Sequence, residues 1–352
     1  MDFKEYIEEK RILIKDNLSL FMGEQKDEDL PAIFKEQKLI ESLEDFALRG
    51  KLIRGTLFIL ICEGLGVTIN KSILNIACAI ELMHSALLIQ DDIIDRDRKR
   101  RGAMTVFARY EKEGNAIGAF ESYHYGVSTA IVVADVAFFF AIELLSEYKE
   151  KNLAELLKFY SHEVYYVAVA ESVDSIFGQT KREPEKEEIY AVYKYKTARY
   201  TFSLPFEMAS IVAGADSKTR EILNRLGEQA GIIFQLKDDE IGLFGEEEVI
   251  GKPVGSDIRE NKKTIIRSML FQYANEHDQE ILRGCFGNPH AGEEEIQKVK
   301  DLYEKYQIKS KIENEVSSIM TGVWKDFESL QIHKDSKNIL KGLLEFNLSR
   351  SK

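Results

Sequence analysis

Three aspartates share one predicted helical turn in the stretch 87–101, which reads LLIQDDIIDRDRKRR. Asp91 and Asp95 are four residues apart, so on a helix they lie on the same face, and Asp92 lies beside them. Carboxylates this close repel one another unless a cation lies between them. Oxygen ligands without a nearby Cys or His suit Mg²⁺, which prefers carboxylates and substrate phosphates. The stretch therefore indicates a metal-bridged site for a phosphorylated ligand rather than a solvated charge run at a helix end.

Positive charge and a second acidic pair extend this hypothesis. Arg100 and Arg101 follow the first cluster, and a guanidinium group binds phosphate in a bidentate fork. Asp238 and Asp239 end another apolar segment. If the two helices face one another across a bundle, their carboxylates form a rim that holds a diphosphate through Mg²⁺. The other basic candidates are Lys196 and Lys252 for that diphosphate, and Lys51, Arg54 and His84 for a second anion bound without metal.

The elements that position these residues are predicted to be helices. Only five prolines occur, and long tracts have apolar residues at helical spacing with almost no strand-like alternation. Pro205 follows Lys196-Thr197 by about two turns and is expected to kink the helix that carries them. We find no internal repeat and no linker, so residues 1–352 are predicted to form one all-α domain, a large helical bundle around a central cavity.

Composition excludes several classes of function and location. The net charge of −12 argues against a general nucleic-acid or anionic-membrane surface. Three scattered cysteines form neither a metal motif nor a disulfide framework, which favours a reducing, cytoplasmic compartment. The segment 126–146 is long enough to span a bilayer, but Asp135 at its middle is costly in lipid. We therefore expect no transmembrane segment, and we expect this helix to be buried inside the protein.

The motifs in their order resemble the trans-prenyltransferases, or isoprenyl diphosphate synthases, over roughly residues 50–263. The family's DDxxD motif with its two arginines and glycine matches 91–95 and 100–102, and its GGKRLRP element matches 49–55 with departures at Arg49, Leu52 and Gly55. Its second aspartate-rich element matches 234–242, with Gly242 where many members have aspartate. The further matches are Lys196-Thr197, a Gly-Gln pair at Gly178-Gln179, and the GKPxGxD element at 251–257 with Lys262.

The resemblance implies an isoprenoid synthase fold and a role for each matching residue. Asp91, Asp95 and Asp238 would ligate Mg²⁺, about three ions per site, with Asp92, Asp239 and Asp257 as outer or water-mediated partners. The allylic diphosphate would also contact Arg100, Lys196, Lys252 and Lys262. Isopentenyl diphosphate would be held by Lys51, Arg54, His84 and Arg101 (the basic set). Thr197 and Gln235 would lie along the forming allylic cation, and the protein would be a homodimer.

The length of the product depends on residues just before the first acidic cluster. A helix rises about 5.4 Å per turn, close to one extended isoprene unit. Ala86 and Leu87 would therefore lie directly beneath the metal site, and Met83 and Leu82 one turn deeper. Neither of the first two is aromatic, so the pocket would continue past fifteen carbons to a floor at Met83. We predict a twenty-carbon main product, geranylgeranyl diphosphate.

Three other functions are compatible with parts of this pattern. A terpene cyclase of the same fold ionises one diphosphate and would not need the basic set. A non-catalytic or regulatory subunit of a heteromeric synthase would be expected to lose acids from one cluster, yet both clusters keep their leading pair. A helical metal-dependent phosphohydrolase would release phosphate without lengthening a prenyl chain.

Overall fold

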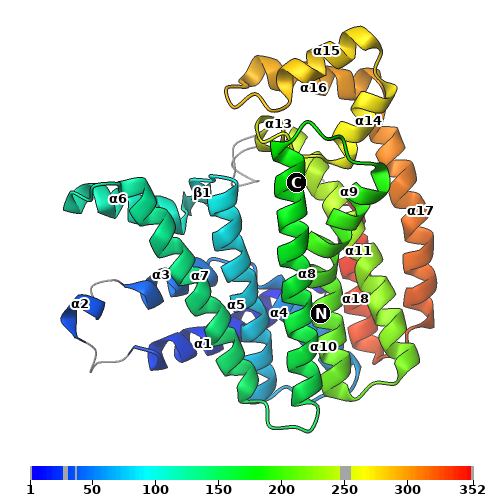
Figure 1. Cartoon of the computed structure of the whole chain (residues 1–352). Helices are drawn as coiled ribbons and strands as arrows, with labels where there is room; N and C mark the ends of the chain where they lie inside the picture. The colour runs from blue at the N-terminus through cyan, green and yellow to red at the C-terminus, as the bar shows by residue number, and fades with distance from the viewer. Residues whose placement is uncertain (1, 27–30, 36–37, 246–254, 350–352) are drawn as a thin grey trace. The chain divides into compact units, whose positions relative to one another are not determined.

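The chain is helical almost throughout, so the all-α prediction is confirmed (Figure 1). The computed structural model describes residues 2–26, 31–35, 38–245 and 255–349. The only strands in these residues are two short antiparallel segments, β1 (Lys99–Arg100) and β2 (Ala103–Met104). The helices before residue 180 are α1 (Phe3–Glu24), α2 (Ala32–Lys35), α3 (Leu39–Leu48), α4 (Ile53–Gly64), α5 (Lys71–Ile94), α6 (Val106–Ile117), α7 (Ser122–Ser146) and α8 (Leu153–Gln179). Those after it are α9 (Lys186–Val192), η1 (Tyr193–Ser203), α10 (Leu204–Ala213), α11 (Ser217–Phe244), α13 (Ser256–Arg259), α14 (Ile265–Tyr273), α15 (Glu276–Cys285), α16 (Glu293–Lys305), α17 (Ile308–Ser329) and α18 (Lys334–Ser349).

Contacts between residues gather into two compact units. Unit 1 consists of Met1–Leu157, Ile211–Ala213 and Ile332–Ile339. Unit 2 consists of Lys158–Ser210, Gly214–Gln331 and Leu340–Lys352. The organisation of residues 1–352 as one domain stays a prediction.

Helix α5 is the core of unit 1. It begins at Asn70, whose side chain accepts a hydrogen bond from the backbone N–H of Ile73 at 3.1 Å, as an N-cap residue does. Every side chain from Ile76 to Ala86 is buried. A helix that is buried on all sides belongs to the interior of a large protein, and α1, α4 and α7 pack around it. The first acidic cluster therefore lies at the end of a rigid, fully packed helix.

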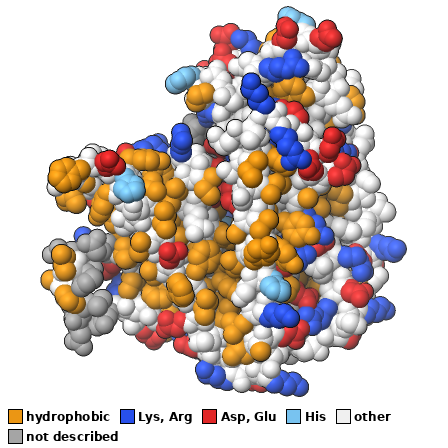
Figure 2. Space-filling view, in the orientation of Figure 1, with side chains coloured by type: hydrophobic (Ala, Val, Ile, Leu, Met, Phe, Trp, Pro, Cys, Tyr) orange, Lys and Arg blue, Asp and Glu red, His pale blue; other side chains and the backbone are white. Residues whose placement is uncertain are grey.

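Helix α7 is buried on one face only. Gly126 lets α7 cross α6 closely, because a Cβ there would lie 2.4 Å from the carbonyl oxygen of Phe107. The opposite face exposes Ile131, Val132 and Phe139, the last with 70% of its surface accessible, and hydrophobic side chains are visible along this helix (Figure 2). The prediction that 126–146 is buried inside the protein is therefore wrong for this face of unit 1.

The same helix is one of two that reach the length and apolar composition of a membrane span. The other is α5, which is mostly buried. In α7, Asp135 and Glu143 are both exposed on the apolar face, and carboxylates at such positions are costly in lipid. Length and composition alone do not establish a membrane span.

The segment around Lys196 in unit 2 is a π-helix rather than a simple proline kink. In η1, the N–H of Leu204 bonds the carbonyl of Arg199, five residues earlier. Proline lacks an N–H and clashes with the carbonyl four residues before it, so the wider π-turn ahead of Pro205 accommodates its ring. Gly231 of α11 permits the close packing of η1, because a Cβ there would lie 2.4 Å from the Cα of Ala198.

Candidate active site

The first acidic cluster occupies the C-terminal end of α5. Asp91 and Asp92 lie in the last turn, and Asp95 is the C-cap residue. The carbonyl groups of this turn carry partial negative charge, which disfavours carboxylates at a helix C-terminus. Asp92 is also almost completely buried, with 1% of its surface accessible. This end of α5 therefore has a strong electrostatic requirement for a cation.

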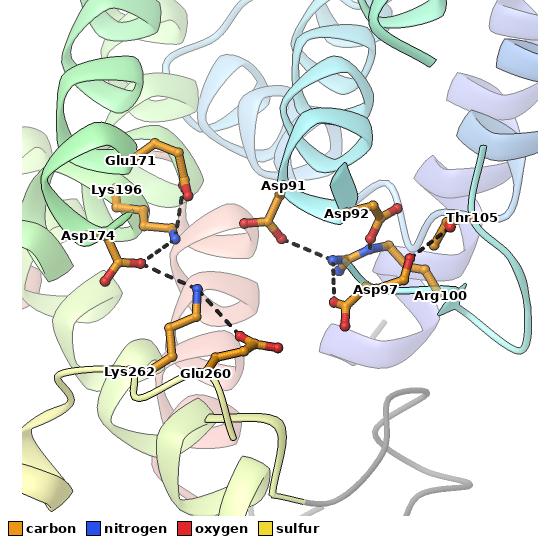
Figure 3. A network of polar contacts seen from close by, with 10 residues as sticks. All are labelled: Asp91, Asp92, Asp97, Arg100, Thr105, Glu171, Asp174, Lys196, Glu260 and Lys262. Carbon is orange, nitrogen blue, oxygen red and sulfur yellow. Dashed lines mark hydrogen bonds and ion pairs between the residues drawn. The ribbon is translucent and has the colours of Figure 1, made fainter. Parts of the chain in front are cut away.

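Arg100 of β1 meets that requirement (Figure 3). Its Nη2 lies 3.0 Å from Oδ2 of Asp91 and 3.5 Å from Oδ2 of Asp97, and its Nε donates to Oδ1 of Asp92. Burial lowers the pKa of Arg100, but the charges of Asp92 and Asp91 raise it by more than burial lowers it. The net pKa is therefore above the usual value, and the guanidinium stays protonated. Thr105 holds the Asp97 carbonyl with a 2.8 Å hydrogen bond. The structure thus joins the predicted phosphate-binding arginine to the predicted metal-binding acids.

The basic set gathers beside the same helix end within unit 1. His84 lies on α5 and is 8% exposed, and its charged neighbours are Arg54, Arg101 and Arg100. The guanidinium of Arg101 lies 5.6 Å from the centre of the Phe46 ring and donates to the Phe46 carbonyl at 3.3 Å. Burial is the main reason that the pKa of Arg101 falls to about 10.

The chain passes close to Arg101 at Gly50. A Cβ on Gly50 would lie 3.1 Å from Nη1 of Arg101 and 3.0 Å from the carbonyl of Ala47. A larger residue would make the guanidinium shift by a few tenths of an ångström. Lys51, the next residue, is exposed. The glycine of the GGKRLRP-like element therefore keeps Arg101 in the basic set.

Lys196 and Lys262 of unit 2 share an acidic partner. Nζ of Lys196 lies 2.6 Å from Asp174 and 2.9 Å from Glu171, and Nζ of Lys262 lies 3.6 Å from the same oxygen of Asp174 and 3.7 Å from Glu260 (Figure 3). The two lysines predicted to contact one diphosphate are therefore brought together. Lys252, the third predicted lysine, lies outside the described residues.

Sequence reasoning missed Glu171 and Asp174. The Gly178-Gln179 match drew attention to the end of α8, but the acids that hold Lys196 come one and two turns earlier on that helix. Two acids three residues apart share a helix face, in an otherwise largely apolar segment. This spacing is the feature of the sequence that indicates an acidic pair on one face of α8. Thr197, predicted beside the allylic cation, is half-buried in η1.

The two aspartates of the second acidic pair have opposite orientations. Asp238 is exposed on α11, whereas Asp239 is 5% exposed and accepts hydrogen bonds from the Tyr193 hydroxyl and from Nε2 of Gln235 at 2.8 Å. Burial, and then the charge of Asp257, raise the pKa of Asp239 well above its usual value. Asp238 is thus the member of the pair that solvent and ligands can reach, while Asp239 and Gln235 are paired with each other.

Gly242 is explained by the position of Asp257. A Cβ at residue 242 would lie 3.2 Å from Oδ2 of Asp257. The short helix α13 begins after Gly255, whose φ of +78° favours glycine, and it carries Asp257 to this place. Gly242 therefore leaves room for Asp257, and the negative charge next to position 242 comes from α13 instead of α11.

The residues predicted to set product length are packed in unit 1. Leu82, Met83 and Ala86 have no accessible surface, and Leu87 is half-buried. Among these four residues, only Leu87 is partly open to solvent. Its side chain shares the helix face of Asp91, four residues later.

The side chains present fit an Mg²⁺ ion whose coordination shell is completed by water and by phosphate oxygens of a substrate. Among the residues that the structure describes, no group of three His, Cys, Asp or Glu side chains forms a preformed metal-binding site. Mg²⁺ does not require one, because it usually keeps several waters and binds through one or two carboxylates plus substrate phosphates. Asp91 and Asp95 in unit 1, and the exposed Asp238 in unit 2, carry oxygen donors of the type that Mg²⁺ prefers.

Burial of His84 predicts a pH-dependent stability. Burial first, and then Arg54, Arg101 and Arg100, lower its pKa well below 6.5. Below pH 6.5 the unfolded chain binds a proton that the folded chain does not, so the free energy of unfolding should fall as the pH decreases, by up to about 1.4 kcal/mol per pH unit. His84→Gln should remove this component in urea denaturation between about pH 5 and 7.5. The exposed-residue control, His290→Gln, should keep the wild-type slope; an unchanged slope in His84→Gln would contradict the assignment.

Comparison with known proteins gives the family. Residues 36–305 match the family model of the polyprenyl synthetases. A short chain isoprenyl diphosphate synthase of Methanocaldococcus jannaschii is 30% identical over 80% of this chain and 79% of its own. A geranylgeranyl diphosphate synthase of Sulfolobus acidocaldarius is 29% identical over 65% of this chain and 66% of its own.

A solved structure confirms the predicted isoprenoid synthase fold. Geranylgeranyl pyrophosphate synthase from Corynebacterium glutamicum, complexed with isoprenyl diphosphate and magnesium, superposes with a TM-score of 0.91 at 26% identity. The superposition covers 99% of this chain and 100% of that chain. The family matches and this likeness agree with the resemblance inferred from the motifs. The chain therefore belongs to the polyprenyl synthetase family and is an enzyme of the trans-prenyltransferase class.

Proposed function

We propose that this enzyme condenses isopentenyl diphosphate with an allylic diphosphate, with Mg²⁺ as cofactor. The observation that supports this most directly is that α5 has two different charged surroundings in unit 1, acids with Arg100 at its C-terminal end and arginines near His84. Arg100 lies among carboxylates, which suits a diphosphate bound with metal. The basic set gathers positive charge around His84, which suits a second diphosphate bound without metal. A terpene cyclase, which ionises one diphosphate, has no use for the second arrangement.

The residues of each unit have distinct tasks in this reaction. Arg100, Lys196 and Lys262, now paired with acids, would exchange those partners for oxygens of the allylic diphosphate and stabilise its charge as the carbon–oxygen bond breaks. Asp91 and Asp95 of unit 1 and Asp238 of unit 2 would hold Mg²⁺, with Asp92 and Asp239 as outer or water-mediated partners, and the ion would supply further neutralisation of the leaving group. The side-chain oxygens of Thr197 and Gln235 would face the cation. The proton lost from the new chain goes to the departing diphosphate, so no side-chain base is needed.

The first test is product formation by the purified chain alone. We expect labelled isopentenyl diphosphate to enter longer prenyl diphosphates only when a short allylic diphosphate and Mg²⁺ are present. Asp91→Asn should lower kcat about a hundredfold or more, because one oxygen donor loses its charge. The control Asp301→Asn, an exposed change on α16, should be silent. No product from the chain alone favours a regulatory subunit, a cyclised hydrocarbon favours a terpene cyclase, and phosphate release alone favours a phosphohydrolase.

We further propose geranylgeranyl diphosphate as the main product. Ala86→Phe should shorten it, because a ring beneath the acidic cluster closes the pocket. Ala86 has no accessible surface, so an enlarged side chain also costs about 1–3 kcal/mol of stability, and each variant needs a thermal denaturation curve. Ala86→Ser serves as the size control. A wild-type product of fifteen carbons, or a folded Ala86→Phe enzyme with unchanged products, would contradict the pocket assignment.

A homodimer accounts for the exposed face of α7. Ile131, Val132, Phe139 and Ile142 are each at least 45% exposed on one helix face, and an apolar face of this kind is typical of an interface core. A second copy presents the same self-complementary face, as two-fold dimers do. Phe139→Glu should shift the sedimentation coefficient from dimer to monomer, whereas Glu143→Gln at the end of the same face should not. A monomeric wild-type protein would contradict this arrangement.

A cytoplasmic location is proposed for the enzyme. Cys62, Cys78 and Cys285 are all buried and free, as expected in a reducing compartment.

A further inference from the structure

Glu81 is a buried carboxylate in the middle of the fully packed helix α5. Only 2% of its surface is accessible. Burying a charge is costly unless hydrogen bonds and opposite charges compensate it. Glu81 lies one turn before His84 and belongs to none of the family motifs described above. Its compensation must therefore come from other elements of unit 1.

The first compensation is the N-terminus of α4. This helix has Leu52 at its N-cap, with φ of +50° and no side-chain hydrogen bond to the first turn. The backbone N–H groups of Arg54 and Gly55 donate instead to Glu81, with the Gly55 nitrogen 2.7 Å from Oε1. A carboxylate at a helix N-terminus satisfies donors that have no partner within the helix and interacts favourably with the helix dipole. Glu81 thus caps α4 from a different helix.

Gly55 makes this cap possible. A Cβ there would lie 2.9 Å from the carbonyl oxygen of Ala77, 3.0 Å from Cδ1 of Ile14 and 3.2 Å from Cγ of Glu81. Only glycine allows α4 to approach α5 so closely. The GGKRLRP element has proline at this position, which has no N–H to donate. The departure at Gly55 is therefore matched to the cap that Glu81 provides.

The second compensation is positive charge. Burial raises the pKa of the Glu81 carboxyl, and the charges of Arg54 and Arg101 oppose that rise. Arg54 belongs to the capped first turn of α4. The contact that links the buried carboxylate of α5 to a member of the basic set is therefore the cap on α4.

We propose that Glu81 is a positioning residue for the basic set: by capping α4 it holds the first turn of that helix, and with it Arg54, in the arrangement that receives a diphosphate without metal. This rests on the proposed function for the identity of that diphosphate. Glu81 does not itself touch the ligand. An arginine binds a diphosphate well only when its guanidinium group is held in place, so loss of the cap weakens binding although it removes a negative charge.

The experiment measures binding without metal. Inorganic pyrophosphate and isopentenyl diphosphate are titrated into the full-length protein with a chelator present, by calorimetry. Glu81→Leu, which replaces the carboxylate with an apolar side chain and loses the cap, should raise Kd about tenfold or more. Glu81→Gln keeps an acceptor oxygen and should stay within about threefold of wild type. In turnover, KM for isopentenyl diphosphate should rise in Glu81→Leu, while KM for the allylic diphosphate stays within about twofold.

Two further variants keep the inference testable. Gly55→Ala changes no charged group but pushes α4 away from Ala77, so it should weaken pyrophosphate binding in the same direction if Glu81→Leu does not fold. Glu163→Gln is the matched control, because Glu163 is likewise buried, with 1% of its surface exposed, and pairs with an arginine, Arg199 of unit 2; the Kd of this variant should be unchanged.

The possible results separate this inference from the proposed function. Equal or tighter pyrophosphate binding in folded Glu81→Leu, or in Gly55→Ala if the former does not fold, overturns the role of Glu81 whatever the enzyme makes. Weakened pyrophosphate binding in a protein that forms no prenyl product supports Glu81 and refutes the proposed function.

Discussion

Carboxylates at the C-terminal end of a fully packed helix require a cation, and this requirement organises the active-site residues of unit 1. Asp91 and Asp92 face the partial negative charge of their own helix end, and Asp92 is buried as well. Arg100 reaches them from β1 and pairs with both. Unit 2 has the reverse arrangement, in which Asp174 holds two lysines. In both units the cations proposed to contact the diphosphate are thus held in ion pairs with acids.

Close packing of backbones is the second recurring feature. Gly50 and Gly55 lie where a Cβ would press on Arg101 or on α5, and Gly231 lies where it would press on η1. Glycine is costly inside a helix because the unfolded chain gains freedom. The missing side chain at Gly50 leaves room for Arg101, and at Gly55 it lets Glu81 reach the backbone of α4. At Gly231 it lets the π-helix that carries Lys196 pack against α11.

The departures from the family motifs have structural counterparts. Gly242 leaves room for Asp257, so the acid on that side of α11 comes from α13. Gly55 supplies both the space and the N–H that the buried Glu81 uses. Pro205 is accommodated by the π-turn of η1, and π-turns inside α-helical segments are frequent at functional sites. Gly242 and Gly55 are thus each matched by a residue of another helix, whereas Pro205 is accommodated by the turn that directly precedes it.

The sequence by itself determined the helical fold, the acid and base clusters and the family, because helix periodicity and motif spacing are local properties of the chain. The motifs also predicted that Asp91 and Arg100 serve the same diphosphate, and that Lys196 and Lys262 contact it together. Tertiary structure alone decided that Glu81 caps α4, that Asp174 holds the lysines, that Asp239 turns inward and that one face of α7 stays exposed. Residue spacing specifies which side chains share a helix face. It does not specify which other helix packs against that face, and that packing decides which charges are buried together.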